Sequence, residues 1–180
     1  MTTKLRPNLL CVLAACGISL ALSSSAWAQQ KYVYKGVPAS TTKYVEQHAI
    51  DVGDIPGHQI RVARLQTKYG DEAPTFDGVK VIESIASLSS DYINGSGRFV
   101  VYSVLTMANG DRIYERGEAT SLSSAAADGS KKTLFSEVLN IVGGTGKFST
   151  IRGTLRQTGS TDFKTGTSDN VTEGEYWFDK

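Results

Sequence analysis

Two glutamates interrupt apolar strand faces and are the first candidates for chemistry. Glu83 is spaced by two from Val81 and Ile85. Glu137 interrupts an apolar run in the same way. Since side chains two apart in a strand share a face, each carboxyl would sit in apolar surroundings, with a raised pKa suited to general acid or base catalysis. The alternative is an outward face on which each glutamate pairs with Arg or Lys.

Three aromatic side chains are the next candidates. Tyr102 and Tyr114 flank the hairpin signal Asn109-Gly110, and Phe99 lies on the same apolar strand as Tyr102. A phenol donates a hydrogen bond to a ligand oxygen while its ring packs on the ligand. We assign Tyr102 to the catalytic set, as an electrophilic helper, and Tyr114 and Phe99 to ligand binding. The alternative is packing in the core or at its rim.

Two arginines lie near the start of the expected sheet. Arg61 and Arg64 fall on opposite faces of one strand, so at most one of them points inward. An inward arginine favours an anionic group such as a carboxylate. We predict Arg64 as the ligand contact.

Neither the histidines nor the glycine-rich turn predicts a metal or cofactor. His48 and His58, the only histidines, are ten apart, a spacing that matches no standard metal motif. The run Gly143-Gly144-Thr145-Gly146-Lys147 lacks the spacing of a phosphate-binding loop and joins two strands, which indicates a tight turn. No dinucleotide, haem or cysteine-cluster motif is present, so we expect no cofactor.

The elements that must position these groups are strands. Strand-like patterns with few helical periods and 18 glycines indicate an all-β sandwich or barrel of seven or eight strands. The expected strands are 58–67, 79–88, 98–107, 112–122, 134–142, 147–157 and 173–178, and residues 123–132 and 158–172 are expected as polar connections. Residues 29–57 form an expected N-terminal extension, and residues 58–180 form the expected β-sheet domain.

The strand at 99–107 is apolar on both faces. Phe99 and Val101 lie on one face, and Val100 and Val104 lie on the other. An antiparallel strand with one wet face alternates more cleanly. Burial of the outer wall against another subunit would explain the pattern, and so would cover by the N-terminal extension. The first explanation predicts a homo-oligomer, a trimer or a dimer.

The N-terminus has the organisation of a signal peptide. Lys4 and Arg6 precede an apolar run over residues 9–22, and Ala26-Trp27-Ala28 supplies the small-residue cleavage pattern. We predict cleavage after Ala28, which removes residues 1–28 and makes the protein periplasmic or secreted. The alternative is a lipoprotein that is lipidated at Cys16.

The mature chain has no electrostatic signature of a nucleic-acid partner. The full chain has 19 basic and 18 acidic residues, and residues 1–28 hold two of the basic ones. Removal of this segment therefore leaves 17 basic and 18 acidic residues. No basic run exceeds Lys131-Lys132. We therefore expect neither nucleic-acid binding nor stable membrane insertion after processing.

Residues 142–153 read Val-Gly-Gly-Thr-Gly-Lys-Phe-Ser-Thr-Ile-Arg-Gly, which resembles the strand–turn–strand signature of dirigent proteins and allene oxide cyclases. The similarity extends over residues 58–180. It implies an eight-stranded antiparallel β-barrel, usually a homotrimer, with a hydrophobic cavity in which reactive organic molecules are cyclised or coupled. Allene oxide cyclases carry a glutamate and an asparagine on the first barrel strand. Here that strand has no carboxylate, so neither named activity is transferred.

Three functions follow as hypotheses. The first is a barrel that binds a small, largely apolar organic molecule and steers its cyclisation or coupling. The second is a cofactor-independent cyclase or isomerase with Glu83 or Glu137 as the proton-transfer group. The third is a structural or interaction barrel filled by its own side chains.

Overall fold

The computed structural model describes residues 30–35, 42–125, 131–162 and 167–180 of the 180-residue chain. The expected signal peptide, its cleavage site after Ala28 and both cysteines lie outside these residues. The described part of the chain is all-β and antiparallel, as predicted. No helix in it is long and apolar enough to span a bilayer.

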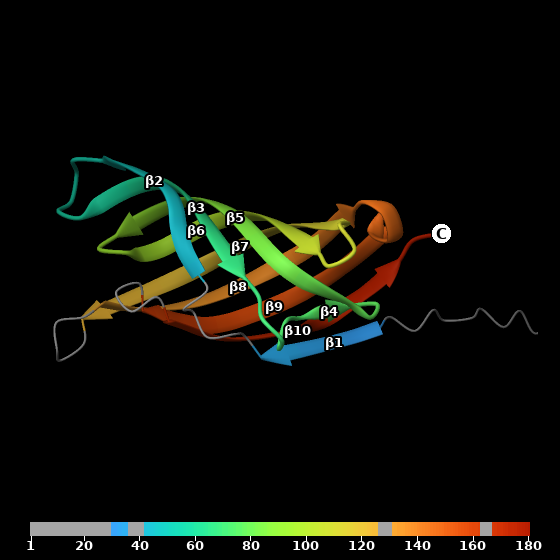
Figure 1. Ribbon diagram of the computed structural model, residues 1–180. Helices are drawn as coiled ribbons and strands as arrows, with labels where there is room; N and C mark the ends of the chain where they lie inside the picture. Colours follow the sequence, from blue (N-terminus) through green and yellow to red (C-terminus); the bar gives the residue numbers. More distant parts are fainter. Residues whose placement is uncertain (1–29, 36–41, 126–130, 163–166) are drawn as a thin grey trace, which may run out of the picture.

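Ten strands make up the sheet (Figure 1). They are β1 Gln30–Lys35, β2 Thr42–Asp51, β3 His58–Lys68, β4 Thr75–Phe76, β5 Val79–Ile93, β6 Ser96–Met107, β7 Arg112–Ala125, β8 Lys131–Gly144, β9 Ile151–Asp162 and β10 Thr167–Phe178. Nine of them follow the order β1-β10-β9-β8-β7-β6-β5-β3-β2, and the short β4 pairs with β5. The sheet is strongly curled, so that β5–β7 and β8–β10 lie on opposite sides of the interior (Figure 1).

Hydrogen bonds do not close this sheet into the expected eight-stranded barrel. The path of paired strands has two ends, β1 and β2, and these two strands do not pair with each other in the described structure. Both edge strands come from residues 29–57, the segment expected as an extension. The chain before residue 58 therefore lengthens the sheet by one strand at each edge.

Several strands run further than their hydrophobic patterns predict. β7 and β8 include residues 123–125 and 131–132, and β9 and β10 include residues 158–162 and 167–172, all expected as polar connections. These stretches are rich in Ser, Thr and Gly and carry little apolar periodicity. Each nevertheless continues a ladder with its neighbour, because pairing depends on the adjacent strand as well as on the side chains.

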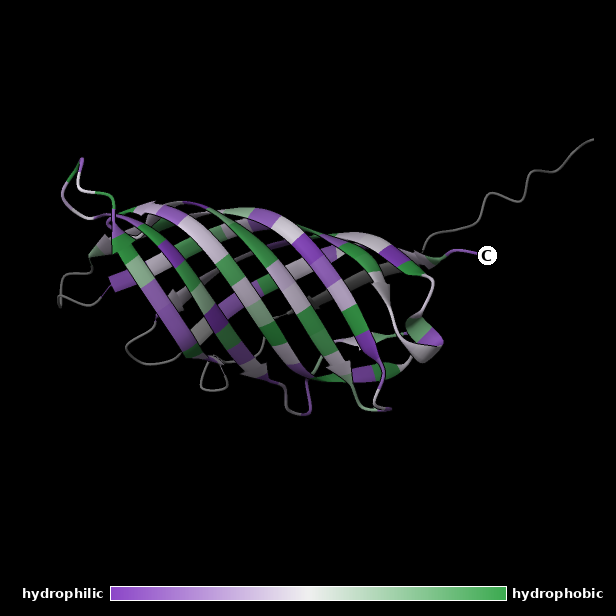
Figure 2. Cartoon of the chain, turned by 90° about the horizontal axis from the view of Figure 1, so that it is seen from above, coloured by the Kyte–Doolittle hydropathy of each residue, from purple (hydrophilic) through white to green (hydrophobic). Residues whose placement is uncertain are grey.

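A register shift in β5 decides which of its side chains face the interior. In β5, Val81 pairs with Met107 but Glu83 pairs with Thr106, so Ile82 is an extra residue. An extra residue reverses the inward and outward phases of a strand. Val81 and, after the shift, Ser84 face inward, which places Glu83 on the other face. Figure 2 shows the alternation of hydrophobic and hydrophilic residues along the strands.

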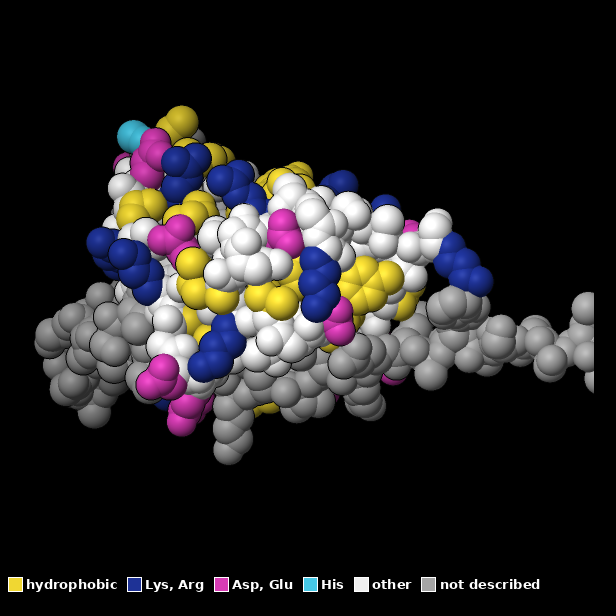
Figure 3. All heavy atoms as spheres, turned by 45° about the vertical axis from the view of Figure 1, so that its right-hand side comes forward, with side chains coloured by type: hydrophobic (Ala, Val, Ile, Leu, Met, Phe, Trp, Pro, Cys, Tyr) yellow, Lys and Arg dark blue, Asp and Glu magenta, His cyan; other side chains and the backbone are white. Residues whose placement is uncertain are grey.

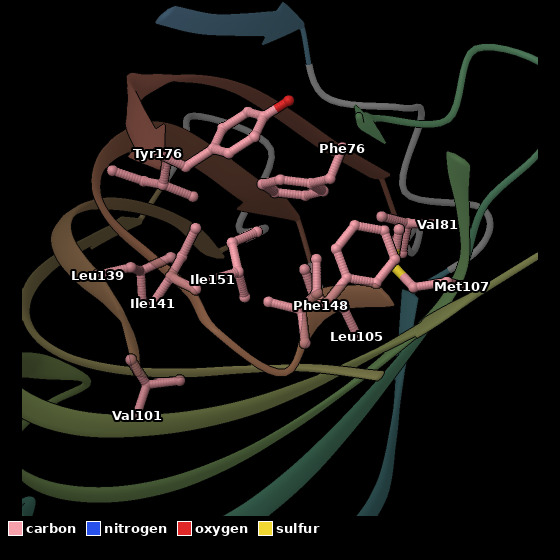
Figure 4. Packing of buried hydrophobic residues seen from close by; sticks show 12 residues of the cluster. Phe76, Val81, Val101, Leu105, Met107, Leu139, Ile141, Phe148, Ile151 and Tyr176 are labelled. Carbon is pink, nitrogen blue, oxygen red and sulfur yellow. The ribbon is translucent and has the colours of Figure 1, made fainter. Parts of the chain in front are cut away.

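A dense apolar cluster fills the end of the interior next to the β6–β7 turn (Figure 4). Its most buried members are Phe76, Val81, Met107, Ile113, Phe148, Ile151, Leu155 and Tyr176. The ring centroids of Phe76 and Tyr176 lie 5.3 Å apart, and the Tyr176 hydroxyl accepts the backbone N–H of Asp77 at 2.9 Å. The hydroxyl of the buried Tyr176 thus has a hydrogen-bond partner. The packed aromatic rings fill this end of the interior.

The glycine-rich turn after β8 is part of the same closed end. Gly146 has a φ of 49°, and a Cβ there would lie 2.0 Å from a carboxylate oxygen of Asp111. The neighbouring Lys147 forms an ion pair with Asp77, at 2.8 Å from Nζ to Oδ2. The turn requires glycine for its conformation and close approach, and its lysine already has an acidic partner.

Hydrophobic side chains also remain on the outside of the sheet, interspersed with charged ones (Figure 3). Val62 on β3, Tyr102 on β6 and Val138 on β8 are all exposed. The described parts of the N-terminal segment pair at the sheet edges and leave these side chains uncovered. The two-sided apolar pattern of β6 thus has no cover within the described chain.

Candidate functional site

A cavity of about 440 Å³ occupies the interior beyond the apolar cluster. Side chains from β2, β3 and β5–β10 line it, which places it within the curl of the sheet. Its walls are mainly apolar and include Leu88, Phe99, Val101, Leu105, Leu139 and Leu155. The Phe99 ring makes an edge-to-face contact with Tyr92, with centroids 6.4 Å apart.

Glu115 is the most buried ionisable side chain of the cavity. It lies on β7, two residues after Ile113. Its cross-strand neighbours are Ser103 on β6 and Ile141 on β8. It is 6% exposed and, within the described structure, has neither a hydrogen bond nor an ion pair. Burial, with repulsion from Glu137 as a smaller cause, raises the pKa of Glu115 to about 8.

Glu137 lines the same cavity from the neighbouring strand β8. It lies opposite Ala119 on β7, four residues along that strand from Glu115. Burial raises the pKa of Glu137 to about 7, and no described basic side chain opposes this shift. Each carboxyl can therefore hold or release a proton near neutral pH, as a general acid or base must.

Glu137 begins a row of polar side chains that crosses three strands. Its cross-strand neighbour on β9 is Gln157, whose neighbour on β10 is Thr172. All three line the cavity. Thr172 is 2% exposed, and its Oγ1 has no hydrogen-bond partner within the described structure. A buried hydroxyl without a partner is costly, so this row is suited to a bound molecule that satisfies it.

The end of the cavity opposite the apolar cluster carries its two basic groups. Arg61 on β3 donates to the Gln47 side chain, hydrogen-bonds the Tyr44 hydroxyl and lies over the Tyr92 ring, with 5.9 Å from Cζ to the centroid. Burial raises the pKa of both tyrosines, and Arg61 opposes this shift. Lys131 donates to the backbone carbonyl of Asn94 at 2.6 Å.

Of the six site residues predicted from the sequence, Glu137 and Phe99 line the cavity. Glu83 does not line it, because the register shift in β5 turns it to the other face, where Gln66 donates to its Oε1 at 2.6 Å. The structure thus has the outward placement that the sequence left open for Glu83, with Gln66 as its partner in place of an Arg or Lys. The sequence pattern shows spacing along a strand but not an inserted residue.

Arg64, Tyr102 and Tyr114 are also outside the cavity lining. Arg64 is exposed beside Glu46, with 3.8 Å between Nη1 and Oε2. Tyr102 is 52% exposed and lies under Arg116, with 5.9 Å from the guanidinium carbon to the ring centroid. The arginine of β3 that lines the cavity is Arg61, and Arg64, the predicted ligand contact, lies on the other face.

The two histidines contact different acidic side chains. His58 Nδ1 lies 2.6 Å from Asp54 Oδ1, and its Nε2 lies 2.8 Å from Asp91 Oδ1. These contacts raise the pKa of His58, the Asp91 hydrogen bond first. His48 lies beside Glu46 instead. Across the described ranges, no three His, Cys, Asp or Glu side chains are grouped to hold a metal ion.

Glu115 is the functional candidate that the sequence analysis missed. It shares a face with Ile113, Gly117 and Ala119, a signal that was present in the spacing. The neighbours of Glu115 on this face include the small residues Gly117 and Ala119, whereas Glu83 and Glu137 have large apolar neighbours. The interruption of an apolar pattern is therefore less evident at Glu115. Burial of this carboxyl depends on β6 and β8, which flank it in the curled sheet.

Comparisons of the chain with protein-family models, with curated proteins and with solved structures find no match. The resemblance to dirigent proteins and allene oxide cyclases therefore stays a prediction.

Proposed function

We propose that this protein binds a small, largely apolar organic molecule inside its curled sheet. The single observation that carries the proposal is the cavity of about 440 Å³, with mainly apolar walls and, within the described structure, a buried Thr172 hydroxyl that has no partner. Small-molecule sites combine these features and have volumes in this range. An interior filled by its own side chains would instead suit a structural role.

The same arrangement suits steering of a reaction, as the predicted resemblance implies. The apolar wall confines the hydrocarbon part of a ligand, and the row from Glu137 to Thr172 orients its polar part. Holding reacting groups in one geometry lowers the entropic part of a barrier without a cofactor. Cyclisation or coupling of a reactive organic molecule is therefore the reaction class that we propose.

A cofactor-independent cyclase or isomerase is the second candidate, and the two buried carboxyls favour it. Glu115 and Glu137 line one cavity and have raised pKa values of about 8 and about 7. One protonated and one ionised carboxyl supply an acid and a base together. In this candidate, Glu115 takes the place of Glu83 as a proton-transfer group beside Glu137, and Tyr102 has no role because it lies outside the cavity lining.

Binding is tested with N-phenyl-1-naphthylamine, an apolar dye whose fluorescence rises in apolar sites. We expect the purified protein to bind it with one site per chain. Ala86 lines the cavity from β5, whereas Ser89 on the same strand is exposed. Ala86→Phe should fill part of the cavity and weaken dye binding, while Ser89→Phe should not. Equal binding by both variants, with unchanged circular dichroism, would place the dye elsewhere and refute the proposal.

We also propose that the mature protein is exported and forms a homo-oligomer. The N-terminal signal pattern supports export, and the uncovered side chains of Val62, Tyr102 and Val138 support self-association. Native mass spectrometry of the periplasmic fraction should find an N-terminus at Gln29, a dimer or trimer, and any ligand that copurifies. A monomer with residues 1–28 still attached would contradict both parts.

A further inference from the structure

The cavity holds two carboxyls and no counter-charge beside them. Glu115 and Glu137 lie on adjacent strands, and within the described structure neither has a hydrogen bond or an ion pair. Removing such a group from water is costly unless something compensates its charge or polarity. In the described structure, no cation and no hydrogen-bond donor contacts either carboxyl group.

The basic groups of the cavity do not fill this role. Arg61 is held by Gln47 and Tyr44 and lies over the Tyr92 ring, and Lys131 donates to a backbone carbonyl. Neither lowers the pKa of Glu115 or Glu137. The two basic side chains of the cavity thus lie at one end and already have partners. In the described structure neither of them forms an ion pair with Glu115 or Glu137.

A second observation points to a ligand at the same place. Thr172 is almost fully buried, lines the cavity and leaves its Oγ1 without a partner in the described structure. It ends the row that begins at Glu137 and passes through Gln157. The hydroxyl and amide oxygens of this row accept hydrogen bonds, as do ionised carboxylates. The surface around the carboxyls therefore offers acceptors to a donor-rich group.

We propose that the cavity takes an apolar organic cation, an alkyl- or arylamine whose ammonium group lies against Glu137 and Glu115 with its hydrocarbon along the apolar wall. This inference rests on the proposed binding function and names its ligand class. An ammonium has three donors and no acceptor, so it suits the carboxylates, the Gln157 carbonyl and the Thr172 hydroxyl. When the ammonium form binds to a protonated carboxyl, the carboxyl proton passes to the solvent.

The test compares three probes with one hydrocarbon: 4-phenylbutylamine, 4-phenylbutan-1-ol and 4-phenylbutanoic acid. Their affinities are measured at pH 7.5 by calorimetry in two buffers of different ionisation enthalpy. We expect the amine to bind roughly tenfold or more tightly than the alcohol, the usual advantage of a charge-assisted hydrogen bond. The acid should bind most weakly, and proton release should accompany binding of the amine alone.

Variants assign the preference to the carboxyls. Glu137→Gln and Glu115→Gln should each reduce the ratio of amine to alcohol affinity. Glu118→Gln is the matched control, because Glu118 lies on the same strand as Glu115 but is exposed. It should leave the ratio unchanged.

The outcomes separate this inference from the proposed function. If the alcohol or the acid binds as tightly as the amine, or if none of the three binds while the naphthylamine dye does, the cation inference is overturned and the binding proposal stands. If neither the dye nor any probe binds, the proposed function fails and this inference fails with it.

Discussion

The two halves of the interior are made by the same strands and differ in what those strands place inside. Near the β6–β7 turn, Met107, Ile113 and Phe148 are fully buried in an apolar cluster. Further along β6–β8, the inward positions hold Ser103, Glu115 and Glu137 around a cavity. Packing and recognition are thus separated along the strands, so that stability and ligand binding should respond to different substitutions.

The largest expected effect is on the packed half. Phe148→Ala removes a side chain that is 0% exposed and should lower the free energy of unfolding by about 3–5 kcal/mol. Phe99→Ala, in the half-buried cavity wall, should cost less because its ring already borders empty space. Urea denaturation of both variants measures the difference. Equal losses would show that the two halves are packed alike.

The cavity half should make stability depend on pH. The pKa of Glu115 is raised from 4.5 to about 8 in the folded protein, so the fold keeps a proton that the unfolded chain releases between these values. Stability from this group is therefore full below pH 4.5 and is lost as the pH rises towards 8. The slope should be about 1.4 kcal/mol per pH unit.

Glu115→Gln should remove the part of this slope that Glu115 contributes, since glutamine does not titrate, whereas Glu137 keeps its own part below about pH 7. Glu118→Gln should keep the wild-type slope because Glu118 is exposed on the same strand. Urea denaturation at intervals between pH 5 and 8 measures all three proteins. An unchanged slope in Glu115→Gln would mean that this carboxyl is not buried in the fold.

A smaller pH effect should come from His58, outside the cavity. Its raised pKa means that its two carboxylate contacts stabilise the fold fully below pH 6.5 and lose this effect as the pH rises through the folded pKa. Asp91→Asn should therefore lower Tm more at pH 6 than at pH 9. A loss of Tm that is independent of pH would point to packing as the role of Asp91.

The smallest effect is expected at predicted site residues that lie outside the cavity. Arg64→Ala and Tyr102→Phe should leave dye binding unchanged, and each should change stability by less than about 0.5–1 kcal/mol. Arg61→Ala, the matched change on β3, alters the cavity lining itself. If Arg64→Ala weakened dye binding more than Arg61→Ala, the assignment of the inward face of β3 would be wrong.

Much of the fold could be predicted from the sequence because its signals are local. The Asn109-Gly110 turn and the apolar alternation around it predicted the hairpin of β6 and β7, and these strands are confirmed. The all-β class followed from the same kind of pattern. The edge strands β1 and β2 could not be predicted, because their membership in the sheet depends on pairing with β10 and β3.

The candidate site was predicted only in part, since Glu137 lines the cavity and Glu83 does not. Both interrupt apolar runs at spacing two, and this pattern predicted an apolar face around each of them. Which face points inward depends on the folded sheet, since one extra residue in β5 turns Glu83 away from the cavity while Glu137 on β8 lines it. Burial of Glu115 likewise depends on β6 and β8 on either side of it. Strand periodicity is a property of neighbouring residues, whereas inward direction and desolvation arise when distant strands curl around a common interior.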